Sequence, residues 1–244
     1  MIRAIFVYLI VIVVLILSSI ALLVEWIIGK INPGLKDRSS LKIVQGLFKM
    51  LLFLTGTKVT IIGKENLPTD RSVLYIGNHK SYFDILINYA NMPGLTGFIS
   101  KAEIGKVPIL KTWMYNVKCL FMDRDDIKQS MKVIITAIEQ IKAGISIFIF
   151  PEGTRCKDDD NFLPFKAGSF KIATKSGCDI IPVAINNSAS VFEKPFPKIK
   201  KAHVIVEYGA PIVVKDMDKE QIKALPEMVQ NTVFEMYNKN KELV

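Results

Sequence analysis

The sequence predicts an α/β fold, with a mainly parallel central sheet covered by helices on both faces and preceded by an N-terminal membrane-associated helical segment. After residue 57, short apolar runs alternate with longer segments of helical periodicity, which is typical of parallel sheets. The run 145–150 is apolar almost throughout, as in a central parallel strand. Residues 4–24 carry no charge and stand outside this pattern.

The uncharged segment 4–24 predicts a membrane anchor. As a helix it would extend about 32 Å, close to the hydrocarbon thickness of a bilayer. Trp26 follows it, and tryptophan favours the headgroup region. A cleavable signal peptide is the alternative, but residues 18–21 form a poor cleavage site. Basic residues are more frequent after the segment, which places the rest of the chain at the cytoplasmic face of the cell membrane, anchored by the N-terminal helices.

A second, amphipathic helix is expected to begin at Ser39 or Ser40 and to end at Gly56. Its polar stripe suits a helix lying in the membrane interface, although a helix packed on the domain core would show the same pattern. Both helices dipping into one leaflet is a third possibility. The predicted division is therefore a hydrophobic membrane helix over residues 1–28, an amphipathic helix with linker over residues 29–56, and an α/β domain over residues 57–244.

Within the α/β domain, the clearest helix is 128–143, where Met131, Ile135 and Ile138 lie on one face. Asp218 caps a terminal helix that is expected to be interrupted or restarted at Pro226. A shorter helix is expected at 167–176. Strands are expected at 58–62, 73–77, 96–100, 117–122, 145–150, 180–185 and 204–208.

Composition narrows the possible partners. The 244 residues carry a net charge of +9, which suits nucleic acid, an anionic membrane surface or a phosphorylated substrate. Beside an apolar terminus the lipid bilayer is favoured, and the sequence shows no nucleic-acid recognition motif. The three cysteines form no C-x-x-C pair, so we expect reduced thiols, no disulfide framework and no metal site.

The stretch from Asn78 to Asp84 follows the strand expected at 73–77, at the position where open α/β sheets bind ligands. Residues five apart diverge by roughly 140° on a regular helix, so a contact between His79 and Asp84 requires a turn. In such a pair the carboxylate holds one ring nitrogen protonated, and the other can act as a general base toward a hydroxyl. Ser81 and Asp84 also fit a helix-capping pattern, and this stretch alone leaves that interpretation open.

The segment from Phe150 to Arg155 leaves the strand expected to be most buried and enters a polar loop. Gly153 lets backbone N–H groups approach an anion, Thr154 adds a hydroxyl donor, and the Arg155 guanidinium is suited to phosphate. Glu152 is unusual in an anion site, and we expect it to orient Arg155 or to accept a substrate hydroxyl.

Two more cations follow expected strands, Lys101 and Arg124. Because the carboxyl ends of parallel strands meet at one edge of a sheet, we expect His79, Lys101, Arg124 and Arg155 to converge on one crevice. A base beside several cations is the chemistry needed to activate a hydroxyl in a phosphorylated substrate.

Taken together, these motifs resemble those of the glycerolphosphate acyltransferase family, and in particular of its lysophosphatidate acyltransferases. The N-H-x-x-x-x-D block is matched by Asn78–Asp84 and the F-P-E-G-T-R block by Phe150–Arg155. Cys156 follows the latter block at a position where the family usually has serine. The second block is matched by Lys101-x-Glu103 with Pro108, leading to Phe121–Arg124, and the fourth by Ile181–Ile185.

This resemblance implies transfer of a fatty acyl group from a thioester donor, acyl-CoA or acyl carrier protein, to the sn-2 hydroxyl of lysophosphatidate, giving phosphatidate. It makes His79 the base and Asp84 its partner. It implies neither a metal nor an organic cofactor. The residues assigned to substrate are Lys101, Arg124, Glu152, Gly153, Thr154 and Arg155.

Three alternatives remain open from the sequence. Another lysophospholipid or glycerol 3-phosphate would use similar groups as the acceptor. Cys156 paired with His79 would give a ping-pong route through an acyl-enzyme. A non-catalytic, membrane-tethered phospholipid-binding module would need no base at all.

Overall fold

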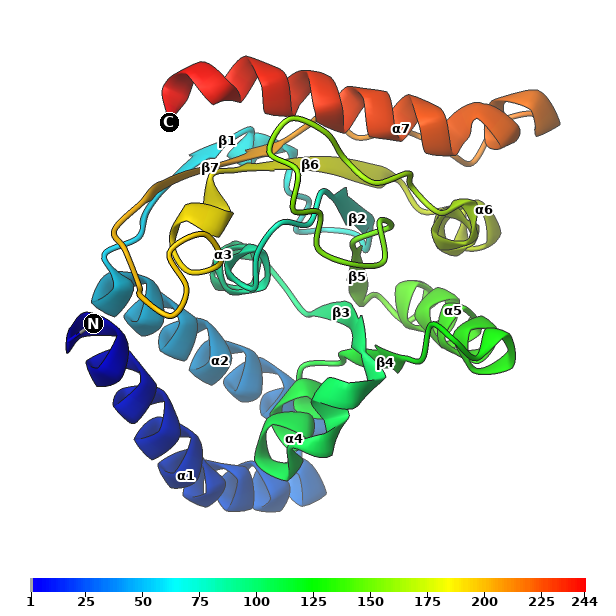
Figure 1. The fold of residues 1–244 in the computed structure, drawn as a ribbon. Coiled ribbons are helices and arrows are strands. Elements are labelled where there is room, and N and C mark those ends of the chain that lie inside the picture. Colours follow the sequence, from blue (N-terminus) through cyan, green and yellow to red (C-terminus); the bar gives the residue numbers. More distant parts are fainter. Residues whose placement is uncertain (1) are drawn as a thin grey trace.

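The computed structural model describes residues 2–244 and contains a seven-stranded sheet in the order β1-β7-β6-β2-β5-β3-β4 (Figure 1). All neighbouring strands pair in parallel except β6 and β7, which pair antiparallel. The predicted α/β class and mainly parallel sheet are confirmed. The strands are β1 (Lys58–Ile62), β2 (Leu74–Gly77), β3 (Thr96–Lys101), β4 (Leu120–Met122), β5 (Ser146–Ile149), β6 (Ile180–Asn186) and β7 (His203–Tyr208).

Helices cover both faces of this sheet, and each face has its own apolar core. Tyr75 of β2 points into the core beneath α2 (Pro33–Thr55), α3 and α4. Its neighbours Leu74 and Ile76 point into the opposite core, beneath α5, α6 and α7. This alternation is what a strand buried on both faces requires. The helices of the domain are α3 (Phe83–Asn91), α4 (Pro108–Asn116), α5 (Ile127–Lys142), α6 (Lys171–Ser176) and α7 (Lys219–Asn240).

Two expectations about the domain are corrected. The strand expected at 117–122 begins only at Leu120, because the preceding residues complete a turn after α4 in which Lys118 has a φ of 64°. The terminal helix α7 is continuous through Pro226. A proline inside a helix costs about 3 kcal/mol. Full burial of three apolar side chains nearby offsets this by about 5 kcal/mol or more. These side chains are Leu225, Val229 and Val233.

The chain begins with a pair of helices, α1 (Ile2–Ile31) and α2, joined at Asn32. The Asn32 side chain accepts a hydrogen bond from the Leu35 N–H (3.0 Å), and Pro33 opens the helix, so α2 begins well before the predicted Ser39 or Ser40. Both serines instead donate to the buried Glu25 carboxylate of α1 (2.9 and 3.0 Å). The predicted end of α2 at Gly56, in the left-handed conformation, is confirmed.

Helix α1 indicates association with a membrane. Among residues 2–244 it is the helix whose length and apolar composition match a bilayer, with a mean hydropathy of 3.2 over its most apolar window. Only 11% of that window is buried inside the protein. In contrast, α2 packs on the domain, because its Gln45 side chain donates to the carbonyl oxygens of Tyr89 (3.2 Å) and Met92 (2.8 Å). The structure therefore shows α2 packed on the core, and its placement in a membrane interface stays a prediction.

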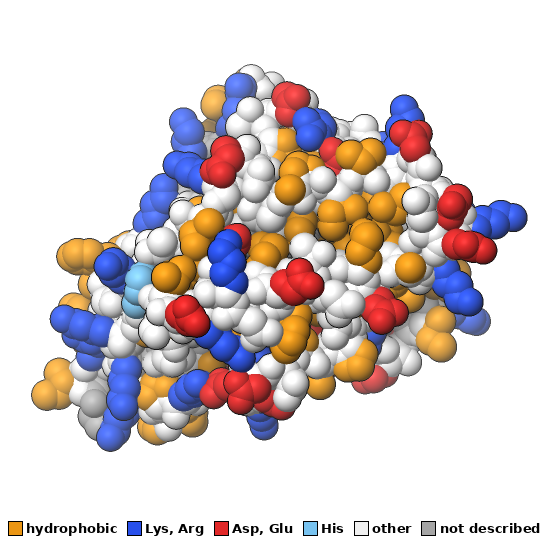
Figure 2. Space-filling view, turned by 90° about the horizontal axis from the view of Figure 1, so that it is seen from above, with side chains coloured by type: hydrophobic (Ala, Val, Ile, Leu, Met, Phe, Trp, Pro, Cys, Tyr) orange, Lys and Arg blue, Asp and Glu red, His pale blue; other side chains and the backbone are white. Residues whose placement is uncertain are grey.

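A basic surface lies beside the start of α1. Seen from above, Lys and Arg side chains gather along the edge of the molecule that carries the N-terminus (Figure 2). In the loop after β6, Phe196 is exposed between exposed lysines, and the Tyr8 hydroxyl of α1 donates to the Pro197 carbonyl oxygen (3.4 Å). A basic edge beside an apolar helix is complementary to an anionic bilayer surface.

Helix α3 is fixed to the sheet by a buried polar contact, which provides a test of the fold. The Tyr208 hydroxyl of β7 donates to the Asn88 side-chain oxygen (2.9 Å), and the Asn88 amide donates to the Asp84 carbonyl oxygen (2.7 Å). Tyr208→Phe leaves a buried acceptor without its donor, so we expect the free energy of unfolding to fall by about 1–3 kcal/mol. Denaturant unfolding in detergent measures it. Tyr115→Phe, at an exposed position, is the matched control, and an equal effect in both variants would contradict this role.

Candidate active site

The site is built at the edge where the parallel strands end. Because β2 and β5 are neighbours, the loop that carries His79 lies beside the loop Phe150–Arg155. The side chain of Asn78 fixes the first loop to β6, since its amide donates to the Ile185 carbonyl oxygen (2.9 Å) and its oxygen accepts from the Ile185 N–H (2.8 Å). Asn78 is fully buried, and through these two hydrogen bonds its side chain pairs with β6 as a neighbouring strand would.

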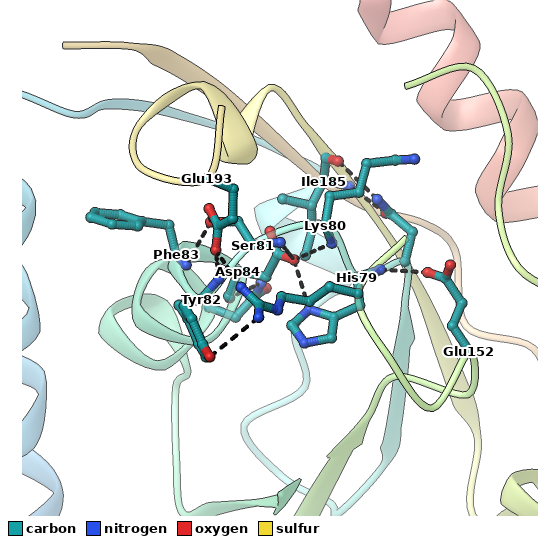
Figure 3. Close-up of polar contacts among 12 residues, drawn as sticks. His79, Lys80, Ser81, Tyr82, Phe83, Asp84, Glu152, Ile185 and Glu193 are labelled. Carbon is teal, nitrogen blue, oxygen red and sulfur yellow. Dashed lines mark hydrogen bonds and ion pairs between the residues drawn. The ribbon is translucent and has the colours of Figure 1, made fainter. Parts of the chain in front are cut away.

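The predicted contact between His79 and Asp84 is present. Asp84 Oδ2 lies 2.9 Å from His79 Nδ1, and it also accepts from the backbone N–H groups of Lys80 (2.7 Å) and Ser81 (2.8 Å) (Figure 3). Asp84 belongs to the first turn of α3, and the backbone turns back between the two residues as the five-residue spacing requires. The carboxylate is completely buried.

This geometry gives the imidazole a defined proton. Asp84 Oδ2 already accepts from two backbone N–H groups, and this favours the tautomer in which His79 Nδ1 donates to it and Nε2 is left as an acceptor. Within residues 2–244, Nε2 has no hydrogen-bond partner and is not among the buried polar atoms. The ring stacks on Phe150, with centroids 4.2 Å apart and planes inclined by 14°. An imidazole held in this way has the chemistry of a general base.

Glu152 holds the two loops together. One carboxylate oxygen accepts from the His79 N–H (2.6 Å) and the other from the Leu163 N–H (2.9 Å). Burial raises the pKa of the Glu152 carboxyl above its ordinary value, and the two N–H donors act in the opposite direction. The expected pairing of Glu152 with Arg155 is absent from these contacts; Arg155 pairs with Glu193 instead.

The partner of Arg155 is Glu193, in the loop after β6. The guanidinium Nη1 lies 3.0 Å from the Glu193 carboxylate, and the guanidinium carbon lies 3.9 Å from the centre of the Tyr82 ring. Glu193 also accepts from the Ser81 hydroxyl (2.6 Å) and the Tyr82 N–H (2.8 Å). Sequence reasoning missed Glu193; the available signal was a single acidic residue in an otherwise basic segment.

Arg124 and Gly153 line a groove of about 400 Å³ on the α5 side of the sheet. Burial lowers the pKa of the Arg124 guanidinium, which nevertheless stays charged at any pH a protein encounters. Gly153 has a φ of +77°, and a Cβ at this position would lie 2.8 Å from the Lys166 ammonium. Lys166 lines the same groove, so the structure adds a cation to those predicted there.

The remaining predicted residues lie further from this cluster. The Lys101 ammonium pairs with Glu103 (2.8 Å) at the surface, and Lys101 lines neither this groove nor the apolar cavity described below. Thr154 is exposed. The convergence expected for four strand ends is therefore present for His79 with the loop 150–155, while Arg124 and Arg155 face different surroundings.

Cys156 is buried and turned into its own loop. Its backbone N–H donates to the His79 carbonyl oxygen (2.7 Å), and its thiol contacts the carbonyl oxygen of Asn161 (3.3 Å). Among the described residues, the hydrogen bond between Cys156 and His79 therefore joins backbone atoms rather than thiol and imidazole. A nucleophilic cysteine would need its sulfur within reach of the base.

A second cavity, of about 280 Å³, lies on the opposite face of the sheet among α1, α2, α3 and α4. The residues that line it include Val14, Phe48 and Trp113, and none of them is charged. Tyr82, on whose ring the Arg155 guanidinium stacks, also lines this cavity. The space therefore suits an apolar group that enters from the catalytic edge.

The fold and this site define an α/β protein with a histidine–carboxylate pair at the edge where its parallel strands end. The family model described as Acyltransferase matches residues 58–186, which include the loops of His79, Arg124 and Arg155. The chain therefore belongs to the Acyltransferase family.

Individual relatives agree with this assignment. The 1-acyl-sn-glycerol-3-phosphate acyltransferase of Borreliella burgdorferi is 32% identical over 157 residues, covering 64% of this chain and 62% of that protein. The chloroplastic 1-acyl-sn-glycerol-3-phosphate acyltransferase BAT2 of Brassica napus is 32% identical over 178 residues, covering 71% of this chain and 51% of that protein. The matched part of the chain thus spans less than two thirds of the length of these relatives.

A solved structure shows the same fold over nearly the whole chain. The crystal structure of the 1-acyl-sn-glycerophosphate acyltransferase PlsC from Thermotoga maritima superposes with a TM-score of 0.84 and 24% sequence identity. The similarity covers 98% of this chain and 95% of that one, so it includes the N-terminal helices as well as the sheet.

The role of Glu152 in joining the two loops is testable. Glu152→Gln keeps the shape but replaces one of two acceptor oxygens by an N–H₂ group, so either the His79 N–H or the Leu163 N–H loses its acceptor. We expect the free energy of unfolding to fall by about 1–3 kcal/mol, as measured by denaturant unfolding. The exposed Glu103→Gln, within about 0.5 kcal/mol of the parent, is the control. Unchanged stability of Glu152→Gln would show that the loops are held elsewhere.

Proposed function

We propose that the protein transfers a fatty acyl group from a thioester donor, acyl-CoA or acyl carrier protein, to the sn-2 hydroxyl of lysophosphatidate, giving phosphatidate. The observation that carries this proposal is the His79–Asp84 pair, whose second imidazole nitrogen is left free at the edge where the parallel strands end. Membership of the Acyltransferase family and the names of the relatives support it.

The chemical step follows from the position of the base. His79 Nε2 removes the proton from the sn-2 hydroxyl while its oxygen attacks the thioester carbonyl. The new C–O ester bond forms, the C–S bond breaks, and the departing thiolate takes up the proton held by the imidazolium. General base catalysis of this kind contributes about 10²–10⁴ in rate. We assign no metal and no organic cofactor to the step.

The acceptor phosphate is assigned to the cations beside the base. Arg124 and Gly153 face the groove, and Arg155 approaches from the Tyr82 side. Glu193 occupies only part of the Arg155 donor set, because a guanidinium has five N–H groups, so the remainder can bind phosphate. Thr154 and Lys101 belong to the predicted set but line neither the groove nor the cavity, so we give them no direct part in holding the phosphate. Glu152 supports the loops instead of touching substrate.

The acyl chain of the donor is assigned to the uncharged cavity of about 280 Å³. Its apolar lining excludes a headgroup or nucleotide, and Tyr82 at its wall connects it to the catalytic edge. The exposed helix α1 keeps the site close to lipid substrates, at the cytoplasmic face of the cell membrane.

The other candidates receive less support. Glycerol 3-phosphate or another lysophospholipid would engage the same base and cations, and a panel of acceptors separates them. A ping-pong route through Cys156 conflicts with the thiol lying against Asn161. A membrane-tethered binding module would leave the buried Asp84 carboxylate and the ordered imidazole without a purpose.

Removal of the base tests the proposal directly. His79→Ala and Asp84→Asn should each lower kcat by about 10²–10⁴, while the protein stays folded and membrane-bound. Phosphatidate formed from a labelled acyl donor and lysophosphatidate measures it. His203→Ala is the matched control, since His203 contacts Thr60 on β1 rather than the site. Cys156→Ser should keep turnover. Full activity of His79→Ala, or loss of activity in Cys156→Ser, would refute the proposed step.

The phosphate assignment is tested at Arg155. Arg155→Lys keeps the charge but loses the fork that binds phosphate through two N–H groups. A lost hydrogen bond between charged groups is worth about 1.5–3 kcal/mol, so we expect the acceptor KM to rise about tenfold or more, with the donor KM unchanged. Arg71→Lys, at an exposed position where the arginine pairs with Asp179 and Asp70, is the control. An effect limited to the donor KM would contradict the assignment.

A further inference from the structure

The outer face of α5 carries an apolar stripe that packing within the chain does not account for. Val133, Ala137 and Ile141 already bury the inner face of the helix against the sheet. Met131 and Ile135 lie on a second stripe and are 59% and 53% exposed. A helix at the surface of a soluble domain normally turns a polar face to this side. The second stripe therefore calls for a partner that the chain itself does not supply.

This stripe forms one wall of the groove of about 400 Å³ introduced with Arg124 and Gly153. The opposite wall is α6 with the segment just before it, and Figure 1 shows α5 and α6 side by side. From Ile127 to Ile138 the α5 wall is about 16 Å long, and it descends from the catalytic edge. The volume of the groove falls in the range of about 300–1,000 Å³ that is common for ligand sites.

The positive charge of the groove favours an occupant that carries an anionic group. Arg124, Lys166, Lys171 and Lys175 line it, and none of the described residues that line it is acidic. The cavity on the other face of the sheet is lined by no charged side chain. One compartment therefore suits a neutral hydrocarbon chain, while the other suits a chain attached to an anionic group. At the catalytic edge the groove begins at Phe150, the ring on which His79 stacks.

The proposed reaction brings together two molecules that each carry an acyl chain, and the acceptor has its phosphate close to the reacting hydroxyl. We propose that the groove between α5 and α6 binds the sn-1 acyl chain of the lysophosphatidate acceptor, with its phosphate at the Arg124 and Lys166 end. This inference rests on the proposed function. It assigns the two chains to opposite faces of the sheet, with the imidazole between them.

Lys171 and Lys175 line the α6 wall and are exposed, so their aliphatic stems can extend its apolar surface while the ammonium groups stay in water. The contribution of such a groove grows with the length of chain buried, by about fourfold in affinity per methylene. The groove therefore predicts that the acceptor affinity rises with the length of the sn-1 chain.

The test fills the groove without disturbing the core. Met131→Trp and Ile135→Trp enlarge exposed side chains on the groove wall, and Met228→Trp enlarges an exposed side chain of α7 as the matched control. Ile135→Ser, which removes part of the wall, provides a second variant if the larger side chains hinder folding. The full-length proteins are assayed in mixed micelles of constant composition with 1-palmitoyl and 1-hexanoyl lysophosphatidate.

We expect each groove variant to raise the KM for the palmitoyl acceptor about tenfold. The KM for the hexanoyl acceptor and the donor KM stay unchanged, and Met228→Trp behaves as the parent. Unchanged dependence on acceptor chain length, with normal turnover, overturns the groove assignment and leaves the proposed function intact. A rise in the donor KM instead assigns the groove to the donor's phosphopantetheine arm and also overturns it. If the groove variants bind lipid vesicles more weakly but keep the parent's kinetics in micelles, the groove is a bilayer contact, and this also overturns the assignment.

A binding measurement separates this inference from the proposed function. The probe is 1-palmitoyl-2-deoxyglycerol 3-phosphate, which lacks the reacting hydroxyl and cannot be acylated. Calorimetry should show that it binds the parent protein and binds each groove variant about tenfold more weakly. If the probe binds in this way but the parent protein forms no phosphatidate, the proposed function is refuted and the groove assignment stands. Equal binding to the parent and to the groove variants refutes the groove.

Discussion

The buried carboxylate of Asp84 is the constraint on which the site depends. Three N–H donors converge on one of its oxygens, one from the His79 ring and two from the backbone of Lys80 and Ser81. Burying a carboxylate is costly unless such donors replace water. The turn after β2, the start of α3 and the orientation of the imidazole therefore all depend on hydrogen bonds to the same carboxylate oxygen. The contacts from Asn88 to Tyr208 and from Asn78 to β6 hold this unit against the sheet.

Around this unit the sheet separates two environments. On one face, α1, α2, α3 and α4 enclose an uncharged cavity; on the other, α5 and α6 border a groove lined with cations. The parallel arrangement of β2, β5, β3 and β4 brings both compartments to the same edge. This asymmetry is the basis on which we propose separate compartments for the two acyl chains.

The loop after β6 links the membrane side of the molecule to this edge. Phe196 lies exposed near the start of α1, and three residues earlier Glu193 binds Arg155, Ser81 and Tyr82. The same short segment therefore contributes to a surface suited to lipid and to the position of a candidate phosphate ligand. Glu193 and Arg155 are 38 residues apart, which explains why no local pattern revealed their pairing.

What the sequence determined by itself rests on short-range physics. Strand periodicity predicted the sheet, Gly56 and the Asp218 capping box marked helix ends, and the spacing of His79 and Asp84 required the turn that the structure shows. The tertiary structure alone decided the partner of Arg155, the engagement of Glu152 with two backbone groups, the continuity of α7 through Pro226 and the open face of α5. Each of these depends on which distant surfaces bury one another, and a free-energy balance set by burial between segments far apart in the chain leaves no signature in the local sequence.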